Sequence, residues 1–444
     1  MVNAPARRAV VLVGNPAAPY SRGLRIARSL AGEGYEVEIA AIAADGVPDL
    51  ELDGAITIRR YPSIGPFAGF AASHGAAPAM ASPAATSSGT TRSGGSRRLL
   101  RVPGRLRRVV RRAGVLFRWV IWPHTVRGWW ASLARDLAPA DLYHACGSLT
   151  IAPALAASKR ARASGREGIV IYDAIDNVFE GNNVLAMPSL LRRVHAARER
   201  RWARSADALT TVNDALATRL GARWGLAPPV SIPNYPEPWT QPSSDPPDRI
   251  RATLGLQPTM RIVLFQGRLS PNLGLDEAAE AVLRVDKACL VLLGFGRWAA
   301  RCSARDGDPR FVGRHFTLPA VHPDELASWT ASADVALVTL PPVSVNQRES
   351  TPNKFWESLL VGTPMVLGPG LDVMAEIVTS SRAGVVARSG EPDAIAEAIR
   401  DVLSKDGETR ARDRRRVAEL AAQRYVWPVA ARAYTALVRV HAHR

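Results

Sequence analysis

Two short apolar runs constrain the fold of this chain more than any other feature. Residues 333–341 have the pattern of one buried strand and residues 365–368 that of the next, with a loop and a helix-like run between them. A strand, a loop, a helix and a second strand in this order favour a crossover between parallel strands. In open parallel sheets, ligands bind at the carboxyl ends of the strands, against helix N-termini. The sequence therefore predicts an α/β domain whose binding site includes the loop after residue 341.

Charged residues are concentrated in that loop and in the helix after it. Pro352 suits the first turn of a helix, so Glu349 is expected on the entering loop and Glu357 more than one turn inside. Free backbone N–H groups and Lys354 then point to one place, as anion binding at a helix N-terminus requires. A nucleotide diphosphate fits there, with the carboxylates accepting hydrogen bonds from ribose and sugar hydroxyls. An ordinary loop-to-helix junction with solvated charges is the alternative.

The N-terminal half shows a second strand–helix–strand pattern. Residues 9–13 form an apolar run, residues 22–32 an amphipathic helix pattern, and residues 34–42 the next strand pattern. No Gly-x-Gly-x-x-Gly fingerprint follows the first strand, which disfavours a dinucleotide cofactor. A length of 444 residues, of which 47% are hydrophobic, suits two domains of about 200 residues each.

The segment around residues 346–364 resembles a known family. It carries an Asn-x-Arg-x-Ser-x-Pro-Asn-Lys-x-x-Glu signature, formed by Asn346, Arg348, Ser350, Pro352, Asn353, Lys354 and Glu357, and a Gly-x-Pro at 362–364 follows. This resembles the donor-sugar site of retaining glycosyltransferases of the GT-B type, family 4, and in particular a bacterial branch. The Glu349 and Glu357 pair also resembles the Glu-x7-Glu of that family.

The resemblance implies two Rossmann-like domains that face a cleft, with a C-terminal helix that crosses back to the N domain. The expected parts are an N-terminal acceptor domain at 1–235 with a basic Arg/Trp-rich insertion at 63–130, a Pro-rich hinge at 236–250, a nucleotide-sugar domain at 251–425 and the crossover helix at 426–444.

The resemblance also implies the donor-site residues. Arg268, Lys354 and Glu349 take catalytic roles, and the donor-binding set is Gly267, Arg268, Leu318, Asn353, Lys354 and Glu357. Fixed cations and helix dipoles can stabilise the leaving diphosphate, so we expect no metal and no cofactor apart from the nucleotide-sugar donor itself. One departure is Leu273, where the family usually has Lys or Arg.

On the acceptor side, the residues expected to contribute are Asn15, Ser21, Arg22, His144 and Asp176. The family branch carries a histidine near the reacting sugar where this chain has Ile175. The polar role then falls to Asp176, Asn177, Glu180 or His144. For His144, the alternative is a core histidine whose hydrogen bonds are satisfied by backbone groups.

Residues 54–135 contain fourteen arginines and no Asp or Glu, in a chain with a net charge of +17. Within them, residues 97–130 show apolar residues at three- and four-residue spacing, with arginines opposite, which predicts an amphipathic basic helix. This predicted helix has three alternative roles: docking on an anionic membrane surface, packing on the N domain, and nucleic-acid binding. The first is favoured, and the four tryptophans expected at the lipid interface are Trp119, Trp122, Trp129 and Trp130. We expect no nucleic-acid partner, because no recognised nucleic-acid-binding signature accompanies the arginines.

The three cysteines, Cys146, Cys289 and Cys302, have neither disulfide-framework nor zinc spacing, and no apolar run has the length of a membrane span. We therefore expect a cytoplasmic protein, peripheral on the inner face of the plasma membrane. The expected function is sugar transfer from a nucleotide-diphosphate sugar to a glycan or lipid-linked acceptor, or to another cell-envelope, polysaccharide or natural-product precursor. The alternative is a catalytically weak nucleotide-sugar-binding scaffold of a membrane biosynthetic complex. An epimerase that isomerises its donor without an acceptor is a third reading.

Overall fold

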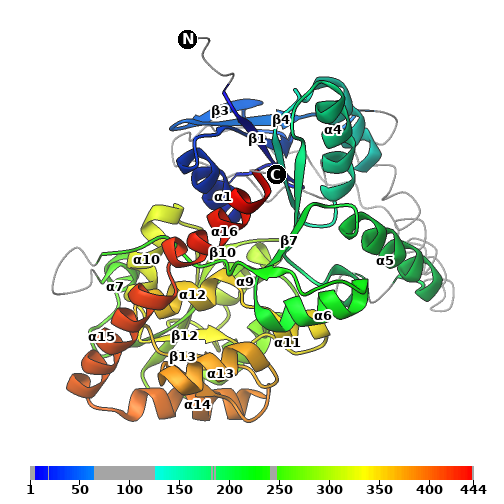
Figure 1. The fold of residues 1–444 in the computed structure, drawn as a ribbon. Helices are drawn as coiled ribbons and strands as arrows, with labels where there is room; N and C mark the ends of the chain where they lie inside the picture. Colours follow the sequence, from blue (N-terminus) through cyan, green and yellow to red (C-terminus); the bar gives the residue numbers. More distant parts are fainter. Residues whose placement is uncertain are drawn as a thin grey trace, which may run out of the picture.

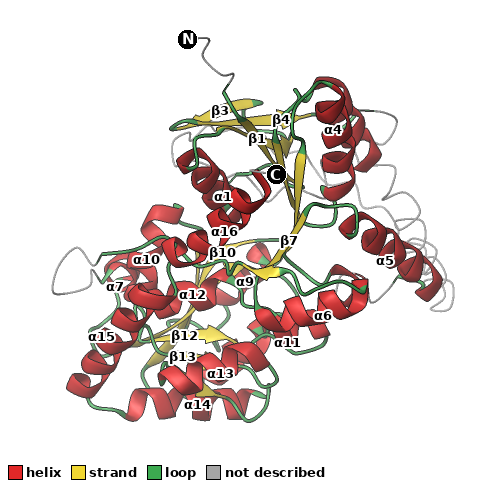
Figure 2. Ribbon diagram, in the orientation of Figure 1, coloured by secondary structure: helices red, strands yellow, loops and turns green. Residues whose placement is uncertain are grey.

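The computed structural model describes residues 6–18, 20–64, 126–181, 184, 187–240 and 248–442. Two parallel sheets, each flanked by helices, lie one above the other in Figure 1, and Figure 2 shows the strands of each as a separate layer. Most of the predicted insertion at 63–130, including 97–125 of the basic helix, lies outside the described residues.

The first sheet has the strand order β3-β4-β2-β1-β5-β6-β7-β8, and its strands run parallel except where β3 pairs with β4. Its elements are β1 (Arg8–Val13), α1 (Ser21–Gly32), β2 (Glu36–Ile42), β3 (Leu50–Asp53), β4 (Ile56–Tyr61), β5 (Leu142–Cys146), α4 (Ile151–Ala163), β6 (Ile169–Ala174), η1 (Val178–Glu180), α5 (Ser189–Ala203), β7 (Ala208–Thr211), α6 (Asp214–Trp224) and β8 (Val230–Ser231). The order reverses between β1 and β5, so their carboxyl ends form a topological switch point.

The second sheet has the order β11-β10-β9-β12-β13-β14 and is parallel throughout its described pairs. Its elements are α7 (Arg249–Leu254), β9 (Arg261–Arg268), α8 (Leu275–Val282), β10 (Ala288–Phe295), α9 (Ala299–Asp306), β11 (His315–Pro319), α10 (Pro323–Ala331), β12 (Val335–Val338), α11 (Val345–Glu349), α12 (Asn353–Leu360), β13 (Met365–Leu367), α13 (Asp372–Ser381), β14 (Gly384–Val386), α14 (Pro392–Ser404), α15 (Gly407–Arg424) and α16 (Trp427–Ala442). Its switch point lies between β9 and β12. The predicted α/β class with two Rossmann-like sheets is confirmed.

The final helix, α16, returns to the first domain, as the family resemblance implied. It lies beside α1 in Figure 1, although α1 is near the other end of the chain. Trp427, Tyr434 and Val438 are buried in the same apolar cluster as Ile26 and Leu30 of α1. The indole N–H of Trp427 also donates to Ser29 Oγ at 3.1 Å. Burial of large apolar side chains is worth about 1.5–3 kcal/mol each, so α16 is an integral part of the first core.

The expected lipid-facing position of Trp129 is wrong. Trp129 lies in a helix at 126–136, is 1% exposed, and donates its indole N–H to the carbonyl of Ala41 at 3.2 Å. Trp130 is half-buried and donates to the carbonyl of Leu149 at 3.0 Å. A buried indole needs a hydrogen-bond partner, and backbone carbonyls of the N domain supply both. This end of the insertion therefore packs on the domain. Trp119 and Trp122 lie outside the described residues.

Candidate active site between the two sheets

The predicted helix start at Pro352 is confirmed. Pro352 occupies the N-cap position with extended backbone, and its carbonyl accepts from the Phe355 N–H at 2.9 Å. The first N–H groups of a helix have no acceptor within the helix, so those of Asn353 and Lys354 are available to an anion. One local expectation is corrected: Glu349 is the last residue of a short separate helix, α11, rather than part of an irregular loop.

Lys354 lies against the carboxyl end of β9. Its ammonium is 3.4 Å from the centre of the Phe265 ring, which is a cation–π contact. A Cβ added at Gly267 would stand 3.8 Å from Lys354 Cε, so the end of β9 and the start of α12 are in close proximity. Burial lowers the pKa of Lys354 to about 7, with the nearby Glu357 charge acting in the opposite direction. A diphosphate in this position would favour the charged ammonium.

Glu357 points to the same region from the second turn of α12. Its Oε2 accepts from the side-chain amide of Gln266 at 2.7 Å, and Gln266 in turn accepts from Thr330 Oγ1 at 2.7 Å. Burial raises the pKa of Glu357, opposed by the Gln266 hydrogen bond and by the charges of Arg25 and Lys354. The other carboxylate oxygen has acceptor capacity for a ligand hydroxyl.

The loop after β9 contains the next expected residues. Gly267 has φ = +109°, a backbone conformation that favours glycine, and Gly294 approaches so closely that a Cβ there would clash with the Gly267 carbonyl. Arg268 is exposed, and among the described residues no ion pair or hydrogen bond engages its guanidinium. Leu273, which replaces the expected cation, packs against apolar clusters of the second domain and adds no charge.

Leu318 lies on β11, opposite Leu293 of β10, near the carboxyl ends of both strands. It is half-buried and packs against the apolar cluster that includes Leu293. Its backbone is thus on the same edge of the sheet as Gly267. Its contact with a base stays a prediction.

Two residues predicted on the acceptor side contact the signature from the other domain. The side-chain amide of Asn353 donates to Ser21 Oγ at 3.3 Å and accepts from the amide of Asn234. Asn346 donates to Asp176 Oδ1 at 3.2 Å and accepts from the backbone N–H of Asn177 at 2.7 Å. The carboxyl edges of the two sheets therefore meet at the signature.

Asn15 instead stabilises its own turn. Its side-chain oxygen accepts from the N–H of Ala17 at 2.8 Å, and Ala17 has φ = +53°. This is a local turn motif in which a short polar side chain substitutes for a backbone acceptor. Whether Asn15 also contacts an acceptor stays a prediction.

Arg22 and His144 are both buried and bonded within the protein, so their contact with an acceptor stays a prediction. Arg22 is 2% exposed and forms two hydrogen bonds to Asp173, at 2.6 and 2.8 Å, and a third to the carbonyl of Ile232 at 2.9 Å. His144 is fully buried; its Nδ1 faces the Tyr434 hydroxyl at 3.1 Å, and its Nε2 lies 3.5 Å from Asp173. The alternative reading, a core histidine, fits better, although its partners are side chains.

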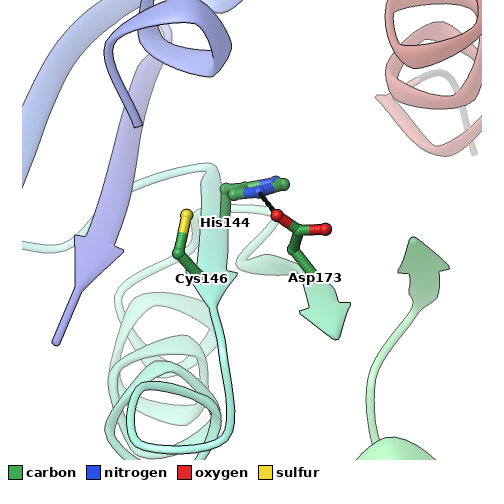
Figure 3. A group of neighbouring side chains, drawn as sticks. All are labelled: His144, Cys146 and Asp173. Carbon is green, nitrogen blue, oxygen red and sulfur yellow. Dashed lines mark ion pairs between the residues drawn. The ribbon is translucent and has the colours of Figure 1, made fainter. Parts of the chain in front are cut away.

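Figure 3 shows His144, Cys146 and Asp173 side by side on β5 and β6. Their ligand atoms lie within 4.8 Å of one another, a spacing that a metal ion could use. However, both oxygens of Asp173 already accept from Arg22, and Thr210 adds a third bond at 2.9 Å. Burial raises the pKa of Asp173, but the Arg22 charge and hydrogen bonds outweigh it and hold that pKa far below the usual range. A metal would have to displace a buried guanidinium, so we interpret the group as a structural ion-pair network.

Comparison with known proteins gives one family match. Residues 260–405, within the second domain, match the family described as glycosyl transferases group 1. No curated protein matches the chain in sequence.

Solved structures extend the likeness from this glycosyl transferases group 1 domain to the whole chain. HepE of Anabaena, solved in complex with UDP-glucose, matches with a TM-score of 0.63 at 15% identity, over 97% of this chain and 99% of its own. Sucrose-phosphate synthase of Thermosynechococcus elongatus matches at 0.62 and 15%, over 98% of both chains. WaaG, a glycosyltransferase involved in lipopolysaccharide biosynthesis, matches at 0.61 and 13%, over 96% and 98%. At these identities the likeness establishes the fold, which is GT-B.

Two residues near the glycosyl transferases group 1 signature were not found from the sequence. Gln266 immediately precedes the Gly267–Arg268 loop, and its position at the end of a predicted strand was the available signal. Arg25 lies one turn after Arg22 on α1, is 8% exposed, and donates to Asn234 Oδ1 at 2.9 Å. Burial lowers the pKa of Arg25 to about 10, with the charges of Glu237 and Glu357 opposing. The charges of Arg25 in the first domain and Glu357 in the second therefore stabilise each other.

No helix in the described ranges is both long and apolar enough to cross a membrane. The expected membrane-facing segment at 97–130 is described only from residue 126 onward, so its docking on an anionic surface stays a prediction.

Proposed function

We propose that this chain is a retaining glycosyltransferase that moves a sugar, most simply a hexose, from a nucleotide-diphosphate sugar to an acceptor. In this reaction the bond from the anomeric carbon to the diphosphate breaks, and a bond from that carbon to an acceptor oxygen forms. The acceptor hydroxyl loses its proton to the departing diphosphate. HepE supports the donor class, since it was solved with UDP and with UDP-glucose.

The convergence of Lys354, Glu357 and the Gly267–Arg268 loop at one switch point carries the proposal. The free N–H groups of α12, Lys354 and Arg268 offer donors and positive charge to the diphosphate. Glu357, oriented by Gln266, offers an acceptor to ribose hydroxyls. Because these fixed cations can offset the charge of the leaving group, we propose that transfer needs no metal.

We further propose that the N domain binds the acceptor, a lipid-linked glycan or another cell-envelope, polysaccharide or natural-product precursor. The boundaries 1–235, 236–250, 251–425 and 426–444 are retained as the proposed domain limits. Residues 97–130 would place the enzyme on the cytoplasmic face of an anionic membrane. A scaffold that binds nucleotide sugar with little turnover is the second candidate, and Ile175 and Leu273 favour it because each replaces a polar residue of the family pattern.

Incubation with a panel of nucleotide sugars tests the proposal. A ligand at 100 times its dissociation constant adds about 2.7 kcal/mol of stability. One donor should therefore raise the unfolding temperature, and the shift should disappear in Glu357→Ala. Donor turnover that persists with EDTA and falls in Arg268→Ala supports a metal-independent transferase. Stabilisation without turnover indicates the scaffold, and isomerised donor without an acceptor indicates an epimerase.

A further inference from the structure

The N-domain helix α6 holds residue 349 of the other domain at two points. Arg219 of α6 donates from Nε to both carboxylate oxygens of Glu349, at 2.8 and 2.9 Å, and from Nη2 to Oε1. Asn213, the N-cap of the same helix, donates its side-chain amide to the Glu349 carbonyl at 2.7 Å. The fork geometry of a guanidinium makes this a directional contact as well as a charge pair.

The other end of α11 is also held by the first domain. Asn346 lies one turn before Glu349, and its side chain bonds to Asp176 and to the backbone of Asn177. Both partners follow β6, whereas Asn213 follows β7. Two neighbouring loops at the carboxyl edge of the first sheet thus fix a five-residue helix of the second domain.

The position of α11 is transmitted directly to the donor site. Only residues 350–352 separate Glu349 from the first residue of α12, and Pro352 within them has a fixed φ. This short connection makes the positions of Lys354 and Glu357 depend on the position of α11. A third interdomain contact, Asn353 with Ser21, lies at the start of α12.

The carboxylate of Glu349 has little capacity left for a sugar. Its side chain is 12% exposed, and both oxygens accept from one guanidinium. A donor hydroxyl would have to share an oxygen that already accepts from Arg219, whereas within the described part of the chain only Oε2 of Glu357 accepts a hydrogen bond, from Gln266. We propose that Glu349 and Arg219 are interdomain positioning residues, which set α11 and the start of α12 against the N domain, and that Glu349 does not bind the donor.

This inference rests on the proposed donor site, and kinetics of matched variants test it in the full-length chain. Arg219→Gln and Glu349→Gln should each raise the donor KM by about two- to five-fold, the range for a partly exposed ion pair, with a smaller change in kcat. The double variant should be no worse than either single one. The exchange Arg219→Glu with Glu349→Arg should restore the donor KM to within about two-fold, because it rebuilds the pair in reverse.

A donor-binding role for Glu349 gives a different result. Glu349→Gln would then raise the donor KM far more than Arg219→Gln does. The donor KM would also stay high in the variant with both charges exchanged, since an arginine cannot accept a hydrogen bond from a sugar hydroxyl. Either outcome overturns the inference. Arg388→Gln is the matched control, because Arg388 pairs with Glu397 on the surface of the second domain alone, and it should leave the donor KM unchanged.

Hydrogen exchange separates this inference from the proposed function. Even without turnover, Arg219→Gln should speed hydrogen exchange of the amides at 345–357 relative to the wild type. The double variant Arg219→Glu with Glu349→Arg should slow it again. Unchanged protection of these amides contradicts the positioning role whether or not the protein transfers sugar. Absent turnover with the expected change in exchange would contradict only the transferase.

Discussion

The ammonium of Lys354 lies 3.4 Å from the centre of the Phe265 ring, which couples the start of α12 to the interior of the central strand β9. The contact places a cation with a lowered pKa where the proposed diphosphate would bind. The positive charge that Lys354 contributes to the site therefore depends on pH near neutrality.

This lowered pKa predicts the pH dependence of donor binding. A diphosphate prefers the ammonium form, so affinity should be nearly constant below the free pKa of about 7 and should fall as pH rises above it. The fall should reach up to about tenfold per pH unit, because binding then takes up a proton. Calorimetric titration of the nucleotide-sugar donor across this range measures it. Lys354→Arg should remove the slope, and a slope that persists there would assign the titration to another group.

Replacing Glu357 should weaken binding of the donor more than binding of the acceptor. Glu357→Ala removes a charged acceptor and leaves the buried amide of Gln266 without its partner. Hydrogen bonds to charged groups are worth about 1.5–3 kcal/mol, so the donor dissociation constant should rise about ten- to a hundred-fold. Equilibrium binding measures the change. Glu376→Gln, an exposed carboxylate on α13, is the control for altered net charge.

Arg22→Ala should destabilise the protein strongly without any direct effect on ligands. It leaves the buried carboxylate of Asp173 without its main partner, which costs about 3–5 kcal/mol. Urea unfolding measures the loss. Arg28→Ala on the same helix removes an exposed pair with Asp53 and should cost less than about 1 kcal/mol. Equal losses in the two variants would disprove the structural role of Arg22.

The same pair should contribute to acid unfolding. The folded-state pKa of Asp173 lies below its unfolded value, so the stabilisation is complete above about pH 4 and declines as pH falls from there towards the folded pKa. The unfolding free energy of Asp173→Asn should therefore depend less on pH in this acid window. Parallel slopes in wild type and variant would contradict the shifted pKa.

Tyr434→Phe should loosen the crossover helix. It removes the hydroxyl that faces His144 Nδ1 at 3.1 Å while keeping the ring in the apolar cluster. A buried hydrogen bond contributes about 0.5–1.5 kcal/mol, and chemical denaturation should show a loss of that size. Val440→Ala, at a 58% exposed position on the same helix, should change stability little. Because alanine favours the helix more than valine does, a loss in Val440→Ala as large as that in Tyr434→Phe would contradict the role of the hydroxyl.

Local patterns predicted the elements that carry the site. Two apolar runs, at 333–341 and 365–368, predicted β12 and β13, and Pro352 predicted the start of α12. These predictions were possible because strand burial and helix initiation depend on neighbouring residues. The apolar periodicity after Pro428 likewise predicted a final helix, and the family resemblance predicted its return to the N domain.

Contacts between residues far apart in the chain could not be predicted from the sequence. Arg219 and Glu349 are 130 positions apart, and no local sequence pattern marks them as partners. Arg22 and His144 were predicted as cleft residues because the helix start at Arg22 and the strand that contains His144 were expected to face the cleft. Their burial depends on Asp173 and on Tyr434 of α16, which only the folded chain brings to them.

The return of α16 also imposes an order on synthesis. Domains generally fold as units during translation, the N-terminal one first. Here the first sheet lacks Trp427, Tyr434 and Val438 until the ribosome has made nearly all of the second. The first domain to emerge is thus the last to complete its interior, and in the interval a nascent chain exposes the apolar side chains of α1 that α16 later covers to chaperones and proteases.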